Sequence, residues 1–115
     1  MVTRIKSGSR MSQAVVHGNM VYLAGQVASD TSADTAGQTR QILATIDSLL
    51  AEAGTDKRHV LTATVYLTDM NTFNEMNAAW EAWIAPGCAP TRATVGAPLA
   101  SSAYRVEIVI TAARA

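Results

Sequence analysis

The segment Val60-Leu61-Thr62-Ala63-Thr64-Val65-Tyr66-Leu67-Thr68 is rich in β-branched residues and alternates in character. Its odd-numbered positions from 61 to 67 are aliphatic, and its even-numbered positions from 62 to 68 carry threonine or tyrosine. Because successive side chains of a strand point to opposite faces, this pattern predicts a strand with one face in a hydrophobic core. Another layer of secondary structure must cover that face.

The segments on either side of this strand have the periodicity of helices. Between residues 34 and 53 the apolar positions follow one helical face, and Gly54 is placed to end the helix. After the strand, Thr72 and Glu75 have the spacing of a capping box, which predicts a helix start. The second helix carries an apolar stripe and ends before Pro86; its stripe consists of Phe73, Met76, Trp80 and Trp83.

Four further segments predict strands and complete the fold. Residues 14–17 and 20–24 flank Gly18-Asn19, a two-residue hairpin signal, and residues 91–97 and 104–112 form the last two strands. The order ββαβαββ predicts one α+β domain over residues 1–115, with a mixed sheet and two helices packed on one face. The other face would be half polar and half apolar, and would show Thr62, Thr64, Tyr66, Glu107, Val109 and Arg92. An oligomer would cover it.

The composition of the 115 residues excludes several classes of protein. They are 49% hydrophobic and 16% charged, where about 25% charged is usual. Nine basic residues balance nine acidic ones, which excludes intrinsic disorder and argues against a nucleic-acid partner. A single cysteine, the lack of a signal-like apolar core in residues 1–13 and the lack of a membrane-length apolar run lead us to expect a cytoplasmic protein with no membrane partner.

The usual catalytic and cofactor motifs do not occur. His17 and His59 have no second ligand at metal-binding spacing, and no glycine-rich phosphate loop is present. Cys88 lies in a loop without an evident base, so it is either a small loop residue or a catalytic thiol. Lys6 and Lys57 have polar neighbours, unlike a desolvated Schiff-base lysine. We expect neither a metal nor a cofactor.

Arg92 and Glu107 stand out because each is a charge inside a strand-like segment. Charged side chains are seldom buried without a partner. The two residues could therefore form a structural ion pair or face water. Alternatively, the guanidinium of Arg92 could bind a substrate carboxylate through two parallel hydrogen bonds while Glu107 handles a water molecule.

Several spaced motifs resemble the RidA (YjgF-type) family of reactive-intermediate deaminases, with the YoaB-like branch as the nearest match. The resemblance covers residues 10 to 113 and rests on the stretches Ser12-Gln13-Ala14, Gly18–Gln26, Ala63–Met70, Phe73–Asn77 with Trp80, Ala89–Val95 and Val106-Glu107-Ile108. It implies a chorismate-mutase-like fold, a homotrimer and active sites between subunits. It also implies hydrolysis of 2-imino or 2-enamino acids to 2-oxo acids and ammonia.

The resemblance assigns roles to individual residues. Arg92 matches the arginine that holds the substrate carboxylate, and Glu107 matches the acid that orients or activates water. Backbone groups near Gly25 and Thr94 would line the pocket, and Asn77 matches a family asparagine.

Two positions depart from well-studied members of the family. Met11 stands where they often have tyrosine, and Ala24 where they often have serine. Met11 would give that wall of the pocket a softer, apolar surface, which bears on substrate preference. The alternative to an enzyme is a trimeric module that binds a small carboxylate metabolite without turnover, for which Arg92 alone would suffice.

Overall fold

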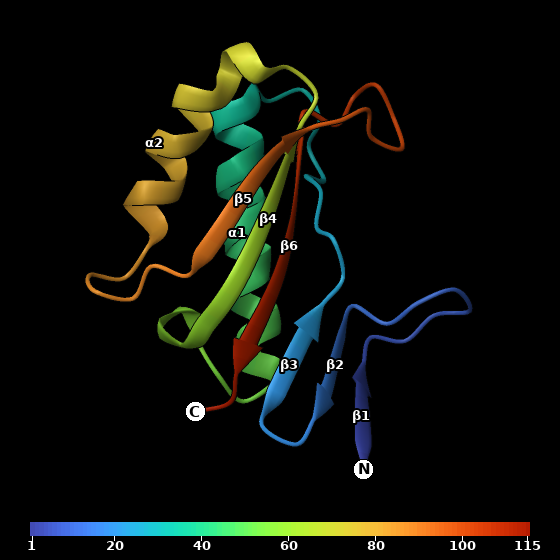
Figure 1. The fold of residues 1–115 in the computed structure, drawn as a ribbon. Helices are drawn as coiled ribbons and strands as arrows, with labels where there is room; N and C mark the ends of the chain where they lie inside the picture. The colour runs from blue at the N-terminus through green and yellow to red at the C-terminus, as the bar shows by residue number, and fades with distance from the viewer.

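The segment that alternates in the sequence is strand β4, Val60–Leu67, which lies inside a six-stranded sheet of order β1-β2-β3-β6-β4-β5. The computed structural model describes residues 1–115 (Figure 1). β4 pairs antiparallel with β6, Val106–Ala113, and parallel with the edge strand β5, Thr91–Gly96. The hairpin of β2, Ala14–His17, and β3, Met20–Leu23, extends the sheet beyond β6. The sheet is therefore mixed, and the predicted α+β class is confirmed.

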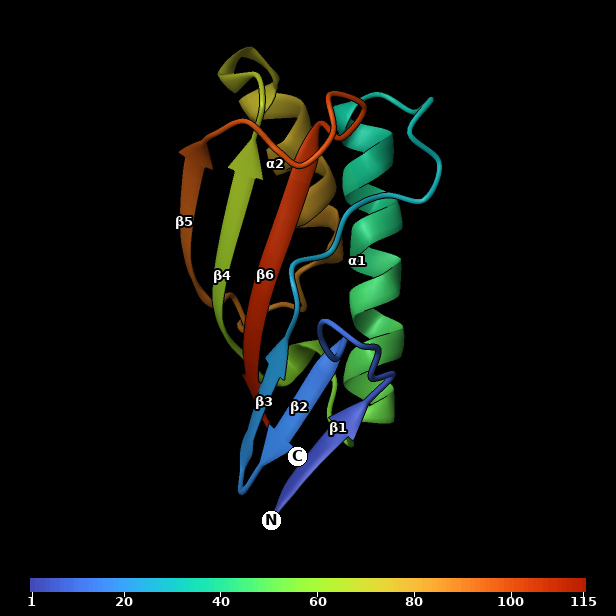
Figure 2. The ribbon, with the colours of Figure 1, turned by 90° about the vertical axis from the view of Figure 1, so that its right-hand side faces the viewer.

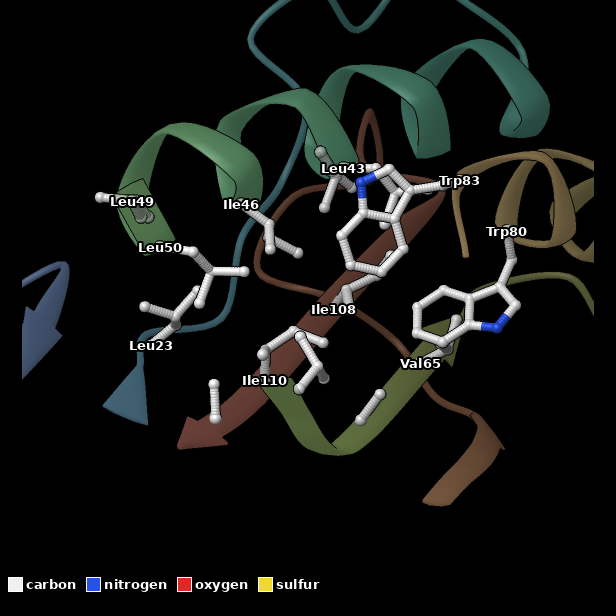
Figure 3. Close-up of a cluster of buried hydrophobic side chains, with 14 of the residues drawn as sticks. Leu23, Leu43, Ile46, Leu49, Leu50, Val65, Trp80, Trp83, Ile108 and Ile110 are labelled. Atoms are coloured by element: carbon white, nitrogen blue, oxygen red, sulfur yellow. The ribbon is translucent and has the colours of Figure 1, made fainter. Parts of the chain in front are cut away.

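Both helices cover the same face of this sheet. Figure 2 looks toward the opposite, open face, with α2, Phe73–Trp83, behind β4 and β6, and α1, Thr35–Glu52, to the right of β6. Between the layers lies a core in which Ile46 of α1, Trp83 of α2 and Ile108 of β6 are all buried (Figure 3). Short 3-10 turns, Lys57–His59 and Met70–Thr72, precede β4 and α2. Neither helix has the length and apolarity that crossing a membrane requires.

Two features of the strands differ from the prediction. An additional strand, β1, Val2–Ile5, pairs antiparallel with β2 at the edge of the sheet. Leu61 was expected to point into the core, but 43% of its surface is exposed. The register between β4 and β6 shifts between Val60 and Thr62, so the alternation that buries residues 63, 65 and 67 does not extend back to Leu61.

The predicted capping box at the start of α2 is wrong. Thr72 makes no side-chain cap hydrogen bond there, and its hydroxyl donates to the carbonyl oxygen of Asp69 at 2.7 Å. The carboxylate of Glu75 instead accepts a hydrogen bond from the backbone N–H of Ala36 in the first turn of α1, at 3.0 Å. Glu75 therefore joins the two helices, because a helix start leaves backbone donors that any nearby acceptor can satisfy.

Candidate functional site

Arg92 lies on the helix-covered face of the sheet, at its edge. Its register partner on β4 is Ala63, a residue of the hydrophobic core. Directly paired residues of neighbouring strands share a face. The prediction that Arg92 belongs to the open face is therefore wrong.

The side chain of Arg92 lies against one face of α2. Its guanidinium carbon is 5.4 Å from the ring centroid of Trp80 and 6.0 Å from that of Phe73. Its Nη1 donates to the sulfur of Met76 at 3.9 Å. Burial lowers the pKa of Arg92, and the negative charge of Glu81 acts in the opposite direction. Arginine stays protonated under such conditions, so this is a partly desolvated cation with apolar walls.

Two other predicted site residues lie at the same edge. Thr94 follows Arg92 by two residues on β5 and pairs with the buried Val65, so it shares the helix-covered face. Asn77 lies one helical turn from both Phe73 and Trp80, the residues whose rings meet Arg92. We call Arg92, Thr94 and Asn77 the arginine edge.

Glu107 lies on the other, open face. It pairs with Tyr66 of β4, between the buried positions 65 and 67. A Cβ atom at Gly25 would lie 2.9 Å from the Cδ atom of Glu107, so any larger residue would displace the carboxylate from this position. Two backbone hydrogen bonds between Gln26 and Ile108, of 2.9 and 3.1 Å, hold the segment with Gly25 beside β6. Gly25 thus lies beside Glu107, whereas Thr94, which was expected to line the same pocket, lies on the helix-covered face within one chain.

A cavity of about 320 Å³ opens beside Glu107 on this face. Most of its lining residues are hydrophobic, although their polar atoms contribute about as much of its surface; the lining residues are Tyr66, Ala97, Pro98, Leu99, Ala100, Glu107 and Val109. It offers space for a small ligand next to the carboxylate.

Met11 belongs to neither group within one chain. It lies in the loop between β1 and β2, on the far side of the sheet from β5, and half of it is exposed. Gln13, two residues after Met11, is in contact with the buried Gln26. The side-chain amide of Gln26 donates one hydrogen bond to the side chain of Gln13 and one to the carbonyl oxygen of Ala24. This contact ties the loop to the segment of Gly25.

The residues that surround Arg92 were missed as site residues. Phe73, Met76 and Trp80 were interpreted as an apolar stripe of the core, which they also are. Their spacing on one helical face was visible in the sequence, but the position of an arginine opposite them depends on the pairing of β5 with β4.

Neither charge of the predicted pair has an ionic partner within the chain. The three ion pairs of the structure are Lys6–Glu52, Arg58–Asp56 and His59–Asp56. Because Arg92 and Glu107 lie on opposite faces of the sheet, they form no structural ion pair in one chain. Each is available to a ligand or to another molecule.

Fold and site together define a small α+β protein with a free cation and a free carboxylate on opposite faces of one sheet. The sequence model of the family described as Endoribonuclease L-PSP matches residues 1–114. A RutC family protein of Haemophilus ducreyi is 49% identical, over 98% of this chain and 97% of its own. The RutC family protein YoaB of Escherichia coli is 44% identical, over 97% of both chains.

Solved structures agree with this assignment. A YjgF family member from Neisseria meningitidis has a TM-score of 0.98 and 43% identity, covering 100% of this chain and 96% of that one. The chain therefore belongs to the YjgF/RutC (RidA) family, as its motifs indicated.

Proposed function

We propose that this protein hydrolyses reactive 2-imino and 2-enamino acids to 2-oxo acids and ammonia, in clefts between the subunits of a homotrimer. The observation that carries the proposal is the placement of Arg92 and Glu107, both without an ionic partner and on opposite faces of one sheet. Two such groups can line one cleft when they come from different copies of the chain. Membership of the YjgF/RutC family is consistent with this role.

The open face has the composition of a surface that another copy covers. Glu107 is its only charged residue on β4, β5 and β6; the others are threonines, alanines, valines and Tyr66. Val95 on this face is 41% exposed in the single chain. Covering the face with neighbouring copies would bury these side chains and bring the arginine edge of one subunit toward Glu107 of the next. A face covered in this way would also account for the low content of charged residues, which is 16%.

In such a cleft Arg92 would bind the substrate carboxylate. Its planar donors match a carboxylate in a bidentate geometry, and hydrogen bonds between charged groups each contribute about 1.5–3 kcal/mol. The partial burial of the guanidinium strengthens this attraction, because less water competes for it. The imine carbon is thereby held at a fixed distance from the opposite wall.

Glu107 would then act on the water molecule that attacks. An enamine first gains a proton at carbon from solvent and becomes the electrophilic iminium ion. The carboxylate accepts a proton as the water oxygen bonds to the iminium carbon, which gives a neutral carbinolamine. Glu107 returns that proton to nitrogen, the C–N bond breaks and ammonia leaves, and the carboxylate takes the hydroxyl proton as the C=O bond of the 2-oxo acid forms. Positioned acid–base catalysis of this kind contributes about 10²–10⁴-fold in rate.

The test is to add the protein to enzymatically generated 2-aminoacrylate or 2-iminobutanoate and to follow 2-oxo acid release. We expect the wild-type protein to accelerate release over buffer and Arg92→Ala to lower kcat/KM by about 10²–10⁴-fold, from the loss of two charged hydrogen bonds. Release at the buffer rate with both proteins would contradict the proposal.

A carboxylate-binding module without turnover is the second candidate, because the arginine edge is complete without Glu107. A ligand-dependent rise in melting temperature with no 2-oxo acid release would favour it. Ribonuclease activity, which the family description names, has less support, since the nine basic residues are matched by nine acidic ones.

A further inference from the structure

Helix α2 carries two tryptophans, and each lies against a different cation. The guanidinium carbon of Arg92 is 5.4 Å from the Trp80 ring centroid, and Nζ of Lys57 is 5.6 Å from that of Trp83. Both indoles are at least nine-tenths buried, and their ring centroids lie 5.5 Å apart. Figure 3 shows Trp80 above Val65 of β4, and Trp83 closer to α1. Only the first cation, Arg92, belongs to the arginine edge.

The two cations differ in what their donors do. Lys57 donates to the carbonyl oxygen of Trp83 at 2.7 Å, so its charge is used within the fold. Arg92 has one weak contact, to the sulfur of Met76, and no carboxylate partner. A guanidinium carries five N–H donors, and within the chain only Nη1 of Arg92 has a partner.

We propose that Trp80, assisted by Phe73, is a positioning residue that holds the guanidinium of Arg92 ready to bind a carboxylate. The inference rests on the proposed function. A free arginine side chain loses several rotatable bonds on binding, and its hydrated faces must shed water. The aromatic walls reduce both costs before the ligand arrives, because they restrict the side chain and replace water on its faces.

This role predicts a specific kinetic signature. Arg92 binds the substrate carboxylate in the ground state and in the transition state alike. Weaker binding by Arg92 therefore raises the free energy of both states equally. We expect Trp80→Leu to raise KM for 2-iminobutanoate about tenfold and to change kcat by less than about twofold. Trp80→Phe keeps an aromatic face and should restore most of the affinity.

Trp83→Phe is the matched control. It also removes an indole from the core of α2, but Trp83 contacts Lys57, Asp47 and the Trp80 ring and not Arg92, and phenylalanine keeps an aromatic ring beside Trp80. We expect its KM to remain that of the wild type, when each variant is assayed well below its own melting temperature. An equal rise of KM in Trp80→Leu and Trp83→Phe would show a general effect on folding and would overturn the inference.

A binding measurement separates this inference from the proposed function. Trp83→Phe leaves Trp80 as the only tryptophan, so its emission reports on Arg92. We expect 2-oxobutanoate to change this emission, and expect no change once Arg92→Ala is added. An emission change that depends on Arg92, in a protein with no turnover, would overturn the deaminase function and support the positioning role. Turnover with a wild-type KM in Trp80→Leu would overturn the positioning role alone, and neither binding nor turnover would overturn both.

Discussion

The arginine edge and the open face around Glu107 hold opposite charges in opposite ways. Arg92 lies on an edge strand, and aromatic rings and a thioether surround it. Glu107 lies on a central strand, against the bare backbone of Gly25 and beside an open cavity. Apolar walls suit a cation that must bind an anion, whereas a base that handles water needs space next to it. Because the sheet separates the two groups, they do not neutralise each other within one chain.

Glu107→Gln tests the open-face half of this comparison and should have the largest effect of the substitutions in that region. The amide keeps the shape of the side chain but no longer accepts a proton, so we expect kcat to fall about 10²-fold or more. Binding of 2-oxobutanoate to the arginine edge should persist, as measured by calorimetry. A variant that retained wild-type kcat would remove Glu107 from the mechanism.

Gly25→Ala makes a smaller change in the same region. The new Cβ would lie 2.9 Å from Cδ of Glu107, and the flexible carboxylate can move away. We therefore expect a folded protein with kcat reduced about tenfold, since a displaced base loses its alignment with water. Gly8→Ala is the control, because a Cβ there would lie at an ordinary 3.7 Å from the nearest atom, and it should keep wild-type activity.

Asp56→Asn should have the smallest effect of these substitutions and should change stability rather than activity. Asp56 pairs with Arg58 and His59, which are not site residues. Hydrogen bonds from the side chain and backbone of Arg58 hold the pKa of Asp56 well below its usual range. A lowered pKa stabilises the folded state above the unfolded pKa of about 3.9, and this contribution is lost as the pH falls. Urea unfolding should therefore show a small deficit of the variant at pH 7 that shrinks below about pH 4. KM should stay unchanged, and a raised KM would show that exposed paired charges matter as much as Arg92.

Much of the fold could be predicted because its elements carry strong local patterns. The hairpin at Gly18-Asn19, the helix before Gly54 and the strand at residues 60–67 all lie where their periodicity and turn residues indicate. Gly54 has the positive φ of +83° that a glycine helix end favours. β1 was missed because its four residues have no pattern of their own and become a strand only by pairing with β2.

The site was harder to predict because it depends on which face each side chain occupies. In β5 the apolar Ala93 and Val95 alternate with Arg92 and Thr94, but the polar pair faces the helices and the apolar pair lies on the open face, so the local pattern indicates the wrong face for Arg92. The parallel pairing of Arg92 with Ala63 settles this, and that pairing is a tertiary property. In the same way, the carboxylate of Glu75 has the spacing of a local cap but bonds to the other helix. Gly25 and Glu107 are also far apart in the sequence, and only the strand register joins them.

The central claim is that Arg92 and Glu107 act together only across a subunit boundary. The most direct test is to co-purify Arg92→Ala and Glu107→Gln chains, differently tagged, as mixed oligomers and to assay 2-oxo acid release. Each variant alone lacks a complete site. In a mixed trimer, one of the three boundaries pairs an intact Arg92 with an intact Glu107, so we expect about a third of the wild-type activity. Mixed oligomers no more active than the single variants would contradict the claim.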